Sequence, residues 1–74
     1  GQIVVDLSAV RYFGSAFITF LLRCHHVCSD RGSELVLAGV NPNIRELLRI
    51  TNLDNHWALY DTLAEAINTL GGSD

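Results

Sequence analysis

The chain has no lysine and no methionine among its 74 residues, and its positive charge rests on five arginines spread along the sequence. Because eight acidic residues outweigh them, the formal net charge is -3, and no basic patch is available to neutralise a phosphate backbone. We therefore expect no nucleic-acid partner.

Long apolar runs are also missing. The longest, residues 16–22, is interrupted by Thr19 and followed by Arg23, and it is far shorter than the ~20 residues that a membrane span requires. The two cysteines, four positions apart, are not the disulfide framework of a small secreted domain, and no secretory signal is visible. We expect a cytoplasmic protein with no direct membrane insertion.

Signature motifs of enzymes are absent as well. The sequence contains no G-x-G-x-x-G, no G-x-x-x-x-G-K-[ST] and no G-x-S-x-G, so neither a phosphate-binding loop nor a nucleophile elbow is indicated. Asp6 and Asp61 lie at the ends of predicted strands, where a catalytic carboxylate can lie, but acidic residues at such places usually form turns or caps. The sequence predicts no enzymatic activity and no cofactor.

The composition that remains favours a compact fold. Hydrophobic residues make up 49% and charged residues 18%, which predicts a single globular domain over residues 1–74. The chain is short and begins at Gly1 directly before an apolar strand pattern. On these grounds we expect a fragment that lacks the first strands of its fold.

Strand and helix patterns alternate along the chain. Consecutive apolar and β-branched residues at 2–8 and 34–40 predict buried strands, the first of them a central strand covered on both faces. A short third strand is expected over 56–60. Short connections favour right-handed crossovers between the strands. The fold class is therefore a small α/β sandwich with a mostly parallel sheet and helices packed against it.

Capping residues mark the helix starts. Ser15 is expected to offer its side-chain oxygen to the first amides of a helix that ends near residue 29. Asn41 is expected to cap a second helix, which ends near Thr51. The third helix opens with a capping box from Thr62 to Glu65.

Two further features refine this assignment. Asn52 follows the second helix, where a left-handed conformation that asparagine tolerates is common. The third helix is expected to stop at Gly71. Apolar residues at helical spacing give its expected core stripe, namely Leu63, Ala66, Ile67 and Leu70.

A cluster of thiols and imidazoles suggests metal or redox chemistry. On a helix Cys24 and Cys28 share one face, and His25 lies three residues before Cys28, so two or three ligands could converge. A structural zinc needs four ligands, and the spacing matches neither zinc ribbons nor haem attachment. The alternative is that both cysteines continue a buried stripe from Phe17 and Leu21, while the histidines face water. The sequence favours this alternative and predicts no metal site.

Ser15 allows two interpretations. It is either a plain helix cap or a regulated hydroxyl, because a phosphoryl group at a helix N-terminus meets free amides and the positive end of the helix dipole. Local sequence alone favours the plain cap.

Three segments of the chain resemble the STAS domains, whose founding members are bacterial anti-sigma factor antagonists. "IVVDLSAVRYFGSAFITFLL", residues 3–22, looks like the family's strand, its D-L-S turn and the loop to a phosphorylatable serine. "ELVLAGVNPNIRELLRITNLD", residues 34–54, is similar to the next strand and helix, with Asn52 where the family usually carries glycine. "LYDTLAEAI", residues 59–67, resembles the closing strand and helix.

The match around the acceptor serine is partial. The family motif reads Asp-Ser-Ser/Thr-Gly-Leu, and the corresponding positions here are Gly14, Ser15, Ala16, Phe17 and Ile18. Only the serine is retained. The resemblance implies that Ser15 is a phospho-acceptor. It also implies a partner-binding surface formed by Tyr12, Phe13, Gly14, Ser15, Ala16 and Phe17.

The resemblance implies a phosphorylation-gated protein-binding module, an anti-sigma factor antagonist that regulates transcription. Its partner would be an anti-sigma factor that is itself a serine kinase, and ATP would belong to that partner. One alternative is a STAS domain without a switch, serving as a scaffold subunit or as the cytoplasmic part of an anion or lipid transport system. Another is a thiol or metal sensor built on Cys24, His25 and Cys28.

Overall fold

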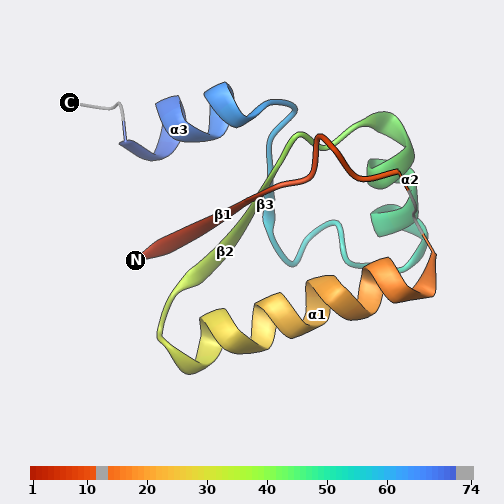
Figure 1. Ribbon diagram of the computed structural model, residues 1–74, viewed down its shortest axis with the longest axis horizontal. Helices are drawn as coiled ribbons and strands as arrows, with labels where there is room; N and C mark the ends of the chain where they lie inside the picture. The colour runs from red at the N-terminus through yellow and green to blue at the C-terminus, as the bar shows by residue number, and fades with distance from the viewer. Residues whose placement is uncertain (12–13, 72–74) are drawn as a thin grey trace.

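The computed structural model describes residues 1–11 and 14–71, and strands and helices alternate along this part of the chain (Figure 1). The elements in order are β1 (Gln2–Asp6), α1 (Ser15–Asp30), β2 (Glu34–Ala38), α2 (Pro42–Ile50), β3 (Ala58–Leu59) and α3 (Leu63–Gly71). β1 pairs with β2 and β2 with β3, both in parallel. The predicted α/β fold with a parallel sheet is confirmed.

The central strand of the described sheet is β2, not β1. The strand order is β1-β2-β3, and the residues from Leu35 to Ala38 are all buried. The prediction that the first strand is central is therefore wrong for the described residues. β1 bonds to β2 on one side only, its two valines Val4 and Val5 are half-buried, and Ile3 is exposed.

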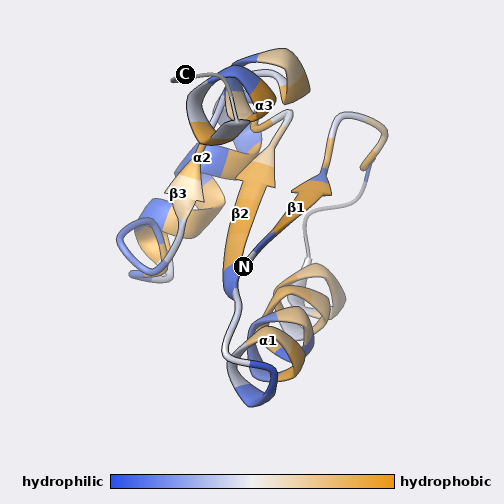
Figure 2. Cartoon of the chain, turned by 90° about the vertical axis from the view of Figure 1, so that its left-hand side faces the viewer, coloured by the Kyte–Doolittle hydropathy of each residue, from blue (hydrophilic) through white to orange (hydrophobic). Residues whose placement is uncertain are grey.

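Helices cover both faces of the sheet (Figure 2). Leu35 and Leu37 point into a core that they share with α1 and α2, whereas Val36 and Ala38 point to the opposite face, toward α3. This alternation follows from the two-residue period of a strand. In Figure 2 the apolar strands consequently lie between α1 and α3.

The buried stripe of α1 is the predicted one. Phe17, Leu21 and Cys28 are buried and Cys24 is half-buried against the same core. None of the helices within residues 1–11 and 14–71 combines the length and apolar character needed to cross a membrane.

The end of β1 is fixed by a side-chain hydrogen bond. The Asp6 carboxylate accepts the backbone N–H of Ser8 at 3.1 Å, which turns the chain and ends the strand before the predicted residue 8. Gly39, which follows β2, lies against this turn with a φ of +67°. A Cβ added to Gly39 would lie 2.7 Å from the Ser8 nitrogen and 2.8 Å from the Asp6 Oδ1. The chain after β1 thus rests directly on the chain after β2.

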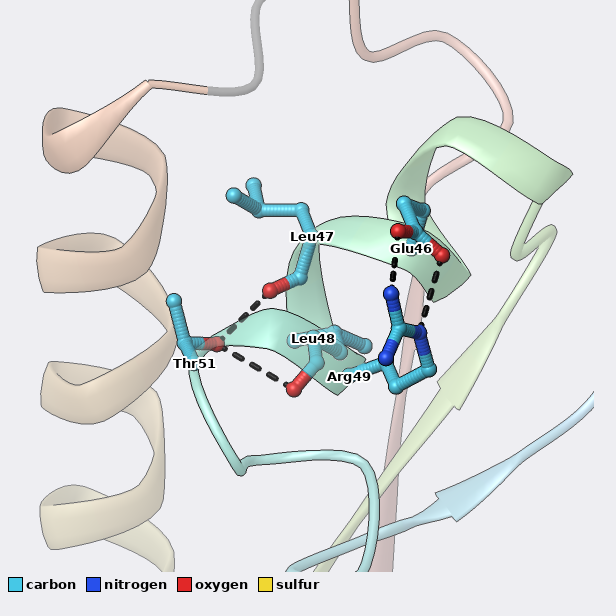
Figure 3. Close-up of polar contacts among 5 residues, drawn as sticks. All are labelled: Glu46, Leu47, Leu48, Arg49 and Thr51. Carbon is cyan, nitrogen blue, oxygen red and sulfur yellow. Dashed lines mark hydrogen bonds and ion pairs between the residues drawn. The ribbon is translucent and has the colours of Figure 1, made fainter.

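Both ends of α2 are closed by side chains, as predicted for its start. The Asn41 Oδ1 accepts the backbone N–H of Ile44 at 2.9 Å. At the other end the Thr51 hydroxyl donates to the Leu47 carbonyl at 2.8 Å (Figure 3). Asn52 then takes a φ of 59°, as expected. The reversal leads the chain back to β3.

An exposed ion pair lies on the outer face of α2. The Arg49 guanidinium donates to the Glu46 carboxylate through Nε at 3.0 Å and also through Nη2 (Figure 3). These hydrogen bonds lower the pKa of the Glu46 carboxyl below its ordinary value. Because both side chains are in solvent, the pair does little for stability.

The third helix starts as expected but packs differently. The Thr62 hydroxyl accepts the backbone N–H of Glu65 at 3.0 Å, and the Glu65 carboxylate accepts the N–H of Asp61, one residue before the predicted capping-box position.

The third strand is shorter than predicted, because the His56 N–H bonds to the Leu53 carbonyl in a turn.

The expected core stripe of α3 is partly wrong. Ala66 is fully buried and Leu70 is half-buried, but Leu63 is 38% exposed and Ile67 is 55% exposed. The helix meets the sheet at Val36 and Ala38 through the small Ala66, so only a narrow strip of α3 is covered. The larger side chains beside that strip remain in solvent.

Candidate functional site

The loops that follow the strands meet at one edge of the sheet. In a parallel sheet the carboxyl ends of the strands share that edge, which is where α/β domains commonly bind ligands. The Leu7 N–H donates to the Ala38 carbonyl at 2.8 Å, and the Val40 N–H donates to the Tyr60 carbonyl at 3.1 Å. The loop after β1, which leads to Ser15, therefore belongs to a connected surface.

Ser15 is the first residue of α1 and is exposed, but it does not cap the helix. The cap is Gly14, whose φ and ψ are -95° and -166°, and no side chain bonds to the free amides there. The Gly14 carbonyl accepts the N–H groups of Phe17 and Ile18 at 3.1 and 3.3 Å, which fixes the cap one residue before the predicted position. The Ser15 hydroxyl is consequently free of the capping role expected from the sequence.

The other residues of the expected docking surface divide between solvent and core. Gly14 and Ala16 are exposed beside Ser15. Phe17 is buried in the core cluster, so it presents no docking side chain, contrary to expectation, because its position on the helix points at the sheet. Tyr12 and Phe13 lie outside the described residues. The described part of this surface therefore consists of three residues with short side chains or none, of which only Ser15 is polar.

Replacing Gly14 with aspartate is expected to stabilise the domain by about 0.5–1 kcal/mol, because the carboxylate can accept a free first-turn amide and faces the positive end of the helix dipole. A side chain fits, since a Cβ added to Gly14 meets no atom within 4 Å and the backbone is extended. Urea unfolding of wild type and of Gly14→Asp measures the gain. Gly14→Asn keeps the cap without the charge, and an equal gain in it would show that the dipole contributes nothing.

The two cysteines lie on the sheet side of α1. Both are free thiols, and burial, followed by the neighbouring Cys28, raises the pKa of the Cys24 thiol above its ordinary value. Raised values keep a thiol protonated and unreactive at neutral pH. Both residues line an apolar groove of about 370 Å³ beside β1, together with Ile3, Val5, Phe20, Arg23, Val27 and Leu35.

The sequence predicts that the histidines face water, and for one of them this is wrong. His25 is half-buried, and its Nδ1 accepts a hydrogen bond from the Trp57 Nε1–H at 3.1 Å. An indole N–H only donates, so the His25 Nδ1 is the acceptor and the ring proton sits on Nε2. Nδ1 is then occupied by the hydrogen bond and Nε2 carries a proton, so neither nitrogen is free to bind a metal ion. In the described residues no group of three or more His, Cys, Asp or Glu side chains is arranged to hold a metal ion.

Comparison with known proteins adds to this geometry. Residues 1–66 match the STAS domain family. Among solved structures, the fold is similar to an anti-sigma-factor antagonist (STAS) domain protein from Planctomyces limnophilus, with a TM-score of 0.76 and 33% sequence identity. That match covers 92% of this chain and 59% of the length of the other protein. With most of its length matched, and with the predicted strands and helices in their expected order, the chain belongs to the STAS domain family.

Proposed function

We propose that the chain is a phosphorylation-gated binding module that antagonises an anti-sigma factor and so regulates transcription in the cytoplasm. Membership of the STAS family and similarity to an anti-sigma-factor antagonist support this proposal. The partner is an anti-sigma factor with serine kinase activity, which supplies the ATP. The chain itself catalyses no reaction.

The observation that carries the proposal is the exposed Ser15 hydroxyl at the start of α1. A phosphoryl group there lies beside the free amides of the first turn and the positive end of the helix dipole. The free domain therefore tolerates the added charge of about -1.5 to -2 without unfolding. A hydroxyl at this place can be modified while the fold persists.

The same charge acts against docking. When a partner covers Ser15, a phosphoryl group loses its hydration, and burying a charge without a paired group is costly. A Cβ added to Gly14 meets no atom within 4 Å other than those of its chain neighbours, and Ser15 and Ala16 beside it are exposed. Unmodified Ser15 with Gly14 and Ala16 thus gives a surface that a partner can cover closely.

Ser15→Glu is expected to weaken partner binding at least about tenfold, because a permanent charge stands at the docking surface. Wild type, Ser15→Glu and Ser15→Ala are used as baits in host lysate, and mass spectrometry identifies the bound proteins and any phosphate on Ser15. Binding of the captured kinase is then titrated with each purified variant. Ser15→Ala should bind like wild type and accept no phosphate.

Thr69→Glu provides the matched control, since Thr69 is exposed on α3, on the opposite face of the sheet. It should bind like wild type. If wild type and Ser15→Glu retain the same partners and Ser15 carries no phosphate, the switch is refuted. The domain is then a constitutive scaffold or a subunit of a transport system.

A further inference from the structure

Two imidazoles, those of His25 and His56, lie against the only tryptophan of the chain, and a third, that of His26, lies beside His25, where α1 passes the turn that leads to β3. The His25 ring lies 6.3 Å from that of His56, nearly parallel at 21°, and 6.1 Å from that of His26. The ring of Trp57 is 5.9 Å from His25 and 5.8 Å from His56. Two of these residues come from α1 and two from the turn.

One hydrogen bond holds the two elements together in this cluster. Trp57 is buried in the core, and its Nε1–H donates to the His25 Nδ1 at 3.1 Å. Because the indole nitrogen is a donor only, the bond exists only while His25 is neutral. An imidazolium carries protons on both nitrogens and has no acceptor to offer.

Protonation of His25 therefore has two local effects. The Trp57 N–H loses its partner inside a largely buried site, which is costly for a polar group. A positive charge also appears beside the rings of His26 and His56. Both effects disfavour the closed arrangement.

The surroundings supply little to offset this charge. The thiols of Cys24 and Cys28 lie on the same helix, and the Cys24 thiol has a raised pKa, so it brings no negative charge. Asp54, in the turn, interacts with Arg49. Within the described residues, no hydrogen bond or ion pair joins a carboxylate to any of the three imidazoles.

We propose that the His25–Trp57 hydrogen bond is a pH-sensitive latch that fastens α1 to the turn before β3, closed at neutral pH and released when His25 is protonated. The latch is independent of any partner. It joins two residues that lie 32 positions apart in the chain. Acidification thus loosens the contact between α1 and this turn.

The direction of the pH effect follows from proton linkage. With the latch closed, the folded chain binds fewer protons than the unfolded chain, so the free energy of unfolding rises with pH through the histidine range. The unfolding equilibrium constant is expected to increase about 3- to 10-fold between about pH 7.5 and about pH 5, in excess of any change in a variant without a titrating acceptor.

His25→Asn is that variant, because its amide oxygen can accept the indole N–H but does not titrate. Urea unfolding of the chain is followed by Trp57 fluorescence at several pH values for wild type, His25→Asn and His26→Asn. His26→Asn removes an imidazole from the same helix and leaves the latch intact, so it should keep most of the pH dependence. His25→Asn should lose most of it.

The indole N–H signal of Trp57 in NMR spectra of the wild type gives a second test that depends on no variant. It should move as His25 titrates, with the pH midpoint of the His25 ring signals. An unfolding pH dependence in His25→Asn equal to that of wild type overturns the proposal. So does an indole signal that stays fixed while His25 titrates.

Discussion

Gly39→Ala is expected to destabilise the domain by about 2–5 kcal/mol, from two separate causes. The φ of +67° costs a residue with a Cβ about 1–2 kcal/mol. The new methyl would also stand 2.7 Å from the Ser8 nitrogen and 2.8 Å from the Asp6 Oδ1, and relieving such a clash costs about 1–3 kcal/mol. Urea unfolding measures the sum.

Gly32→Ala separates the two causes. Gly32 has nearly the same φ, +69°, but an added Cβ meets no atom within 4 Å. Its expected cost is therefore the conformational part alone, about 1–2 kcal/mol. If both substitutions cost the same, a methyl group at Gly39 causes no clash, and the loops after β1 and β2 do not pack as closely as described.

Leu37→Ala is expected to cost about 2–5 kcal/mol, because Leu37 is 0% exposed in the central strand and its loss leaves a cavity. A domain of this length has roughly 4–11 kcal/mol of total stability. The variant should therefore show a much lower urea midpoint, with a substantial unfolded fraction in dilute denaturant. Circular dichroism during urea titration measures both.

Leu63→Ala is the matched control for this loss. Leu63 was expected in the core from its helical spacing, but it is 38% exposed. Alanine is the better helix former, so the net cost should stay below about 1 kcal/mol. A loss as large as that of Leu37→Ala would mean that α3 buries Leu63 and lies on the sheet in another orientation.

The order of elements could be predicted because each is encoded by local patterns. Asn41 caps α2 and Asn52 takes the left-handed conformation after it, both for reasons that involve only neighbouring residues. Parallel pairing followed from the alternation of strands and helices with short connections. These parts of the fold need no knowledge of distant contacts.

The packing of the elements was harder to predict. An apolar β-branched segment looks the same whether it lies in the centre or at the edge of the described sheet, so β1 was misplaced. The predicted core stripe of α3 was partly wrong for a similar reason. Helical spacing of apolar residues does not tell whether the small Ala66 or the larger Leu63 and Ile67 meet the sheet. Both errors concern partners that lie far away in the sequence.

In the candidate site, too, local features could be predicted and contacts between distant residues could not. The exposed serine at a helix start was predicted from a local motif, although the cap is Gly14 rather than Ser15 itself. The contact between His25 and Trp57 was missed, because no pattern links residues 32 positions apart. A lone tryptophan beside a histidine in a predicted strand gave no signal of the partner on α1.

The parallel sheet also bears on how fast the chain reaches its native state. Gln2 pairs with Glu34, and Val36 pairs with Ala58, so each pairing closes a segment that contains a whole helix. No two-residue hairpin is available in the described residues to start the sheet locally. Folding of such non-local topologies is slow relative to helical bundles of the same size. The strands of a newly synthesised chain therefore stay unpaired for a time, and β2, which takes part in both pairings, is open to wrong partners until β1 and β3 have bound to it.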